Sequence, residues 1–189
     1  MLTDSIISNV LKNISEKTST DQQISKYLST KSYRQEKIAF NDPLEITDLE
    51  KFFRFFSKES KLVLPQDYLD FLLIHNGGIL YSHPEYGGGL ELLSLQRIEE
   101  LYAIYKEFLP VGWYPIAVEE GTEFLFIDSN LCNSASRASN YLFWASIEDI
   151  NDAPTNLNSN FELWLDRYFA SQGNRFWEWM KYPVEYYYR

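Results

Sequence analysis

The chain has 189 residues, of which 45% are hydrophobic and 17% aromatic; this is enough for one ordinary domain with a real core and excludes wholesale disorder. Its 17 basic and 27 acidic residues give a formal net charge of −10, which disfavours nucleic acid and anionic membranes and favours a cationic partner. No apolar run is long enough to span a bilayer, no signal peptide is recognisable, and the single Cys132 has no internal disulfide partner. We therefore expect a cytoplasmic protein.

Residues 1–45 are predicted to form a polar, helical extension before the main domain. A first amphipathic helix is expected over residues 3–15, because apolar residues recur there at helical spacing: Ile6, Ile7, Val10, Leu11 and Ile14. A weaker pattern predicts a second helix over 21–33, with Thr20 as its N-cap. The pattern leaves open whether this extension packs on the domain or serves as a dimerising arm.

The domain proper is predicted to begin at residue 46 with a capped helix that ends near Ser57. Thr47 and Glu50 have the spacing of a capping box, in which each side chain satisfies a free backbone donor at the start of a helix. Apolar residues then follow at helical spacing: Leu49, Phe52, Phe53 and Phe56.

Residues 64–78 encode a short helix with both ends fixed. Pro65 suits the first helical position, where its missing N–H costs nothing. Asp67 places a negative charge near the positive end of the helix dipole, and His75 lies near the other end. The run Asn76-Gly77-Gly78 then ends the helix, because glycine adopts the left-handed conformation without a steric clash.

After Gly78 the periodicity changes to that of short strands. Strands are expected at 79–81, 90–93, 113–118, 123–128 and 141–146, with one helix capped by Ser94 and a last helix capped by Asn160 and closed by Gly173. This order predicts an α+β fold, a single domain over 46–173 with a mainly antiparallel sheet flanked by helices. An aromatic C-terminal tail, residues 174–189, follows the domain.

The reactive side chains do not form a recognisable catalytic pattern. His75 and His83 have neither a metal-binding nor a catalytic-triad spacing, and Cys132 lies in a loop without a partner motif. The run Gly87-Gly88-Gly89 lacks the lysine and the helix of a phosphate-binding loop. We expect no catalytic residue, no metal and no cofactor.

Four carboxylates flank one predicted hairpin: Glu119, Glu120, Glu123 and Asp128. They are interpreted as the hydrophilic edge of a sheet, with two alternatives, an acid and base pair or an acidic face that meets a basic partner. Glu148, Asp149 and Asp152 would extend this face if they lay on the same side, which the sequence leaves open.

Aromatic residues supply the remaining candidate contacts. Trp177 and Trp179 lie in the tail, which either folds back over the sheet or forms an exposed binding patch, and we expect partial burial. Tyr86 lies in the loop 82–89, which with the loops 119–123 and 129–140 is expected to present variable contacts.

Residues 64–78 resemble the signature of the SUKH superfamily of Smi/Knr-like domains, reading L-P-x-x-Y-x-x-F-L-x-x-x-N-G-G. The preceding helix carries I-x-x-L-E-K, and L-x-x-L-S-L-x-x-I, Y-P-I-A-x-x-x-G-x-x-F-x-x-x-D and F-x-x-W-L follow in order. The resemblance covers residues 46–171 and implies a protein-binding domain, in many members an immunity protein that occludes a toxin. Two alternatives are a regulatory interaction module in cell-wall or signalling control and, from another class, a metal-dependent hydrolase built on the carboxylates of 119–128.

Overall fold

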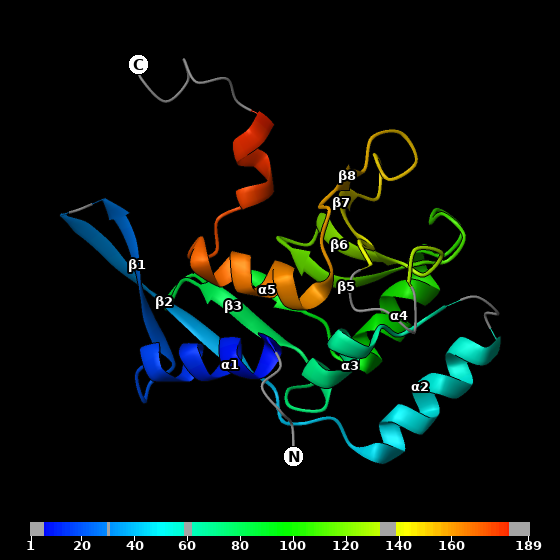
Figure 1. Cartoon of the computed structure of the whole chain (residues 1–189), viewed down its shortest axis with the longest axis horizontal. Helices are drawn as coiled ribbons and strands as arrows, with labels where there is room; N and C mark the ends of the chain where they lie inside the picture. Colours follow the sequence, from blue (N-terminus) through cyan, green and yellow to red (C-terminus); the bar gives the residue numbers. More distant parts are fainter. Residues whose placement is uncertain (1–5, 30, 59–61, 133–138, 182–189) are drawn as a thin grey trace.

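The computed structural model describes residues 6–29, 31–58, 62–132 and 139–181 (Figure 1). Its described strands form one eight-stranded sheet in which each strand pairs with the next along the chain. They are β1 (Gln23–Ser29), β2 (Ser32–Phe40), β3 (Gly78–Ser82), β4 (Leu90–Leu92), β5 (Trp113–Glu119), β6 (Glu123–Asp128), β7 (Leu142–Ser146) and β8 (Thr155–Asn156). Every pairing is antiparallel, which confirms the predicted α+β fold.

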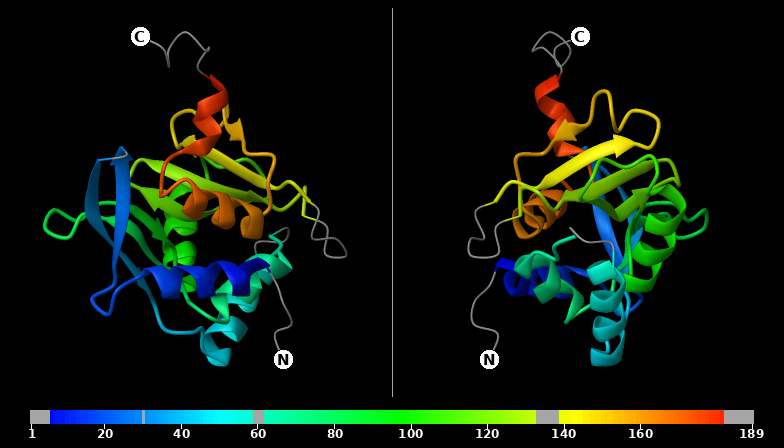
Figure 2. Two further views of the ribbon diagram at one scale, coloured as in Figure 1. Left: turned by 60° about the vertical axis from the view of Figure 1, so that its left-hand side comes forward. Right: turned by 90° about the vertical axis from the view of Figure 1, so that its right-hand side faces the viewer.

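Helices cover both faces of this sheet (Figure 2). On one face α1 (Ile6–Lys17), α3 (Gln66–Leu72) and α5 (Phe161–Ala170) contact one another. On the opposite face α4 (Leu95–Tyr105) packs on β5, and α2 (Ile46–Lys58) packs on α4. A 3₁₀ helix, η1 (Phe176–Lys181), follows α5 at the carboxyl end of the described chain.

The core beneath α3 and α5 is built from aromatic rings. Phe161, at the start of α5, has its ring centroid 4.7 Å from that of Tyr68 and 5.2 Å from that of Phe71, both on α3. Trp164 and Tyr168 continue the same face of α5 and are fully or almost fully buried. The high aromatic content of the sequence is therefore used largely inside the molecule.

The predicted helix over 21–33 is wrong, because this segment forms β1 and the start of β2. Side chains alternate along the hairpin: Lys26 and Glu36 are buried on one side, whereas Tyr27 and Tyr33 are exposed. Pairing of β2 with β3 extends the sheet, and this tertiary contact outweighs the weak helical pattern. The extension therefore packs on the domain, and its helical part is α1, which lies against α5.

Local helix signals were correct where a side chain caps a free backbone N–H. The Ser94 hydroxyl accepts from the N–H of Arg97 at 3.2 Å, and the Asn160 amide oxygen accepts from the N–H of Leu163 at 3.0 Å. The predicted capping box at Thr47 is wrong. α2 begins at Ile46, so Thr47 lies inside the helix, and its hydroxyl donates to the Glu45 carboxylate at 3.5 Å. Pro65 is the N-cap of α3 rather than its first helical residue.

The signature run after α3 ties three elements together. The Asn76 side-chain oxygen accepts from the N–H of Leu95, at the start of α4, at 3.0 Å, and Asn41 donates to the Asn76 carbonyl at 2.7 Å. Gly77 has φ of +85°, and a Cβ there would lie 2.5 Å from the carbonyl oxygen of Leu92. These residues thus fix the positions of β3, β4 and α4, which is a structural role.

Asp67, expected near the start of its own helix, also serves the start of α5. Its buried carboxylate accepts from the Tyr141 hydroxyl at 2.5 Å and from the N–H of Glu162 at 3.1 Å. Burial, together with the adjacent carboxylate, raises the pKa of Tyr141 well above its ordinary value, so its hydroxyl remains a donor.

Candidate functional site

The hairpin of β5 and β6 carries the acidic residues singled out in the sequence. Its turn has two successive residues with positive φ, Glu120 at 52° and Gly121 at 76°, and the Glu120 side chain is exposed. Glu119 and Glu123 are paired across the two strands on either side of this turn. The turn therefore projects carboxylates beyond the end of the sheet.

The structure does not bring the four predicted carboxylates together. Glu119 accepts from the Nε of Arg175 at 2.7 Å, so its charge is used within the molecule. Asp128 is buried and accepts from the backbone and side-chain nitrogens of Asn130, at 2.9 and 2.8 Å. It lies five residues along β6 from Glu123, or about 17 Å in a strand. The four do not form one acid and base site.

A different set of carboxylates meets in a groove between α4 and the β5–β6 turn. One hollow of 300 Å³ lies between α4, residues 88–89 and strands β3 to β6. A second hollow of 540 Å³ lies between the end of α4, the β5–β6 turn and residues 146–149. Both are lined by Tyr105, Gly121 and Phe124, so they adjoin, and we call them together the α4 groove. Its carboxylates are Glu91, Glu120, Glu123, Glu148 and Asp149.

Aromatic and aliphatic side chains line the base of the α4 groove. The Tyr105 and Phe124 rings pack edge to face with centroids 5.6 Å apart. Phe124 is buried, Tyr105 is half-buried, and Ile79 remains 44% exposed. The groove therefore combines an apolar base with an acidic rim.

The charge of this groove is strongly one-sided. Five carboxylates line it against a single guanidinium, that of Arg97, which is paired with Glu100 at 3.0 Å. Clefts lined by one sign of charge focus the field and attract ions of the opposite sign. The open question about residues 148–152 is also answered: Glu148 and Asp149 lie with Glu123, and Asp152 is not among the lining residues.

Sequence reasoning missed two members of this groove. Glu91 lies between two buried leucines on the short strand β4, and this alternation was the available signal that its carboxylate faces the other side of the sheet. Tyr105 is the last residue of α4, and nothing local in the sequence indicated that it would border a hollow.

The loop that carries Tyr86 borders the groove. Gly88 and Gly89 of this loop line the first hollow, and Tyr86 itself is 83% exposed. The Tyr86 ring stacks on His83 at 4.6 Å, and the Nδ1 of His83 accepts from the N–H groups of Glu85 and Tyr86 at 3.1 and 3.2 Å. His83 therefore holds the shape of the loop.

The tail residues lie on the opposite face, and the expected partial burial is observed in their described part. Trp177 is buried, with its ring centroid 5.0 Å from that of Trp144, whereas Trp179 is 53% exposed. Arg175 places its guanidinium 5.0 Å above the Trp144 ring. Together with the Arg175–Glu119 pair, this contact anchors the start of the tail; residues 182–189 lie outside the described residues.

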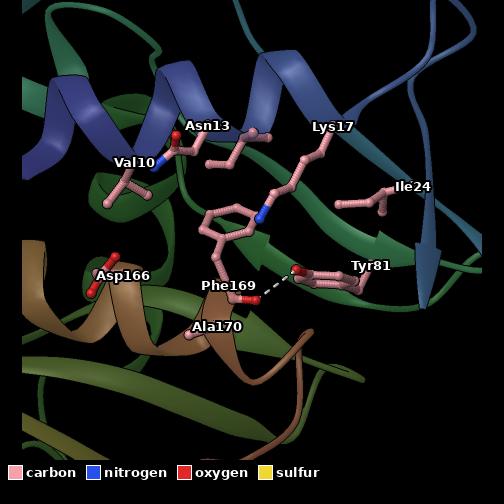
Figure 3. A pocket seen from close by; sticks show the side chains of 9 residues that line it. Val10, Asn13, Lys17, Ile24, Tyr81, Asp166, Phe169 and Ala170 are labelled. Carbon is pink, nitrogen blue, oxygen red and sulfur yellow. Dashed lines mark hydrogen bonds between the residues drawn. The ribbon is translucent and has the colours of Figure 1, made fainter. Parts of the chain in front are cut away.

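A smaller hollow of 140 Å³ lies between α1 and α5 (Figure 3). Val10, Ile24 and Phe169 line it, with Lys17 and Asp166 as charged members, and the Tyr81 hydroxyl donates to the Phe169 carbonyl at 3.4 Å. Tyr81 has a positive φ of 54° at the irregularity in β2–β3 pairing. No local pattern in the sequence indicated this hollow.

The other potentially reactive side chains, Cys132 and His75, are held in packing and hydrogen-bonding contacts within the fold. Burial, with a contribution from Asp128, raises the pKa of the Cys132 thiol to about 12, which keeps it protonated and a poor nucleophile. The His75 ring stacks on Phe40 at 4.5 Å, and its Nδ1 lies 3.1 Å from the Asn41 carbonyl oxygen. Within the described residues, no three His, Cys, Asp or Glu side chains are grouped to hold a metal ion. Among the described helices, none is both long and apolar enough to cross a membrane.

Comparison with known proteins agrees with this architecture. A family model described as the SMI1 / KNR4 family (SUKH-1) matches residues 41–167. YobM of Bacillus subtilis (strain 168), described as an uncharacterized protein, is 34% identical over 162 residues, covering 84% of this chain and 80% of YobM. YnaB of the same strain, also described as uncharacterized, is 35% identical over 145 residues, covering 77% of this chain and 88% of YnaB. The YobM match is longer than the stretch matched by the family model, so the similarity extends beyond it.

Proposed function

This chain belongs to the SMI1 / KNR4 family (SUKH-1), and on that basis we propose that it is a non-catalytic protein-binding domain that serves as an immunity protein. In this proposal it binds a cognate toxin with a basic surface and covers the toxin's active site or substrate groove. The proposed place of action is the cytoplasm.

The observation that carries the proposal beyond family membership is the α4 groove. It presents carboxylates on a solvent-facing rim above an apolar base, in a chain whose net charge is −10. Complementary charge speeds the encounter of two proteins, and aromatic side chains provide much of the binding energy in many interfaces. Occlusion needs only this kind of surface.

The test is protection during co-expression with the toxin that this proposal expects to be encoded beside the gene. Cells that carry the toxin together with this protein are expected to grow, and the two proteins are expected to co-purify. Phe71→Ala is the destabilised control, because it removes a fully buried core side chain and should cost about 3–5 kcal/mol of stability. It should lose protection only as a consequence of unfolding. Lack of protection by the soluble wild-type protein, together with no captured toxin, would count against an immunity role.

A regulatory module would use the same surface on a host protein. It predicts an isolated gene with no toxin beside it and a captured partner that is not toxic. Gene neighbourhood and the identity of the captured protein therefore separate the two functions.

A further inference from the structure

We propose that the α4 groove receives a basic segment of the partner, anchored by an arginine or lysine side chain whose stem packs on Tyr105. The proposal rests on the proposed function and adds the chemistry of what is bound and the face that binds it. Its anchor is held by carboxylates of the rim, in particular Glu120, Glu123 and Glu148.

The first argument is that, in the described part of the chain, three of the five groove carboxylates lack cations of their own, whereas Glu123 lies within electrostatic reach of Arg175. Among the described residues, no side-chain hydrogen bond or ion pair joins Glu91, Glu120 or Glu148 to a basic group. Acidic residues elsewhere on the surface do have such neighbours: Asp48 lies 2.7 Å from Lys51, Glu100 3.0 Å from Arg97 and Glu119 2.7 Å from Arg175. Cations are thus distributed over the rest of the surface and are scarce in the groove.

The second argument concerns the apolar base. Lysine and arginine side chains bury their methylene stems on apolar surface while their charged ends remain among polar groups. Tyr105, half-buried and packed on Phe124, provides such a surface at the junction of the two hollows. A cation near an aromatic ring is also attracted by the electron-rich face of the ring. A neutral or acidic segment would leave the carboxylates without compensation.

The third argument is the shape. The two hollows, 300 and 540 Å³, share Tyr105, Gly121 and Phe124 and adjoin there, so the groove has room for several consecutive residues. An extended or helical segment fits this shape better than a small enclosed ligand does. The rim residues come from three separate connections, 88–91, 120–123 and 146–149, which allows contacts along the length of the segment.

The test uses the full chain and a fluorescein-labelled peptide of alternating arginine and glycine, with citrulline in place of arginine as the neutral control. The groove variant is Glu120→Lys with Glu148→Lys. The matched control is Glu16→Lys with Asp21→Lys, which changes the net charge equally at exposed residues of α1 and the adjoining turn. Thermal melting of each protein confirms that it is folded.

The arginine peptide is expected to bind in anisotropy measurements, with affinity falling about tenfold in the groove variant and less than about twofold in the control. The citrulline peptide is expected not to bind. Tyr105→Leu should weaken binding about two- to fivefold by removing the ring. Amide chemical shifts should move at residues 119–123 and along α4.

Equal weakening by both charge pairs, or shifts confined to α1 and η1, would overturn the proposal, because binding would then be unspecific or elsewhere. Growth protection separates this failure from failure of the proposed function. A groove variant that still protects cells from the toxin removes the groove and leaves the immunity role. Peptide binding at the groove without protection by the wild-type protein removes only the immunity role.

Discussion

Single residues in this protein connect segments that are distant in the sequence. Asp67 on α3 holds the first turn of α5 through Glu162 and Tyr141, and Arg175 holds the end of β5 through Glu119. In both cases a charged side chain that the sequence presents as a surface group is part of the framework. A carboxylate can therefore be assigned to partner binding only after its contacts within the molecule have been ruled out.

Replacing Asp67 with Ala is expected to lower the free energy of unfolding by about 2–3 kcal/mol, because two buried donors lose their acceptor. Asp67→Asn should cost less, since one amide oxygen can still accept. Urea denaturation measures both, with Asp166→Asn, an exposed change on α5, as the control. A loss from Asp67→Ala no larger than that of the control would contradict the capping role.

The raised pKa of Cys132, about 12, predicts slow thiol chemistry in the folded state. Relative to an ordinary thiol with a pKa near 8.5, the thiolate fraction at neutral pH falls by about 10³ to 10⁴, so alkylation of the native protein should be far slower than alkylation in urea. Because the folded pKa is the higher one, the stability from the neutral thiol is full below pH 8.5 and is lost as pH rises toward 12. An alkylation profile of the native protein with a midpoint near 8.5 would contradict this.

At the scale of elements, the turn after α3 decides how the strands and α4 meet. Gly77 allows the chain to pass within contact of the Leu92 carbonyl, and Asn76 caps the start of α4. The signature of the family thus encodes a junction. Its predictive value for function is indirect, because it identifies the fold on which the groove is built.

Gly77→Ala is expected to destabilise the protein by more than about 3 kcal/mol, because positive φ strain adds to a clash with backbone atoms. Gly87→Ala is the matched control: φ is +71° there, but a Cβ would meet no atom within 4 Å. It should cost only about 1–2 kcal/mol from the left-handed conformation. Thermal or urea unfolding of the pair measures the difference, and equal losses would contradict the junction model.

Sequence reasoning succeeded where the determining contact is local. Ser94 and Asn160 were recognised as caps because their partners lie three residues away, and the strands from β3 to β7 followed from short apolar runs and turn residues. β1 and β2 were missed, because β2 joins the sheet by pairing with β3, about 40 residues later, and β1 is added to the sheet only through β2.

The candidate site was only partly accessible from sequence for the same reason. Glu120 and Glu123 were correctly placed at the hairpin. Glu119 is paired with Arg175, which lies 56 residues later in the chain, and this pairing could not be predicted locally. The approach of Glu148 and Asp149 to the hairpin depends on the pairing of β6 with β7. Neither contact leaves a local pattern in the chain.

For the molecule as a whole, the two faces of the sheet have different characters. The face under α1, α3 and α5 is closed by the aromatic core and by the anchored start of the tail. The α4 face retains an acidic groove with an exposed rim. This asymmetry fits the proposed binding role, in which one side of the sheet supplies stability and the other side presents the contacts.

Inactivation of a toxin by occlusion, as proposed here, predicts a fixed stoichiometry, which a titration measures. Increasing amounts of purified protein are added to a fixed amount of the neighbouring toxin, and toxin activity is measured. Occlusion predicts a linear loss of activity that ends at one equivalent and is restored when the complex is separated. Inactivation by far less than one equivalent, or full activity in excess protein, would contradict the account.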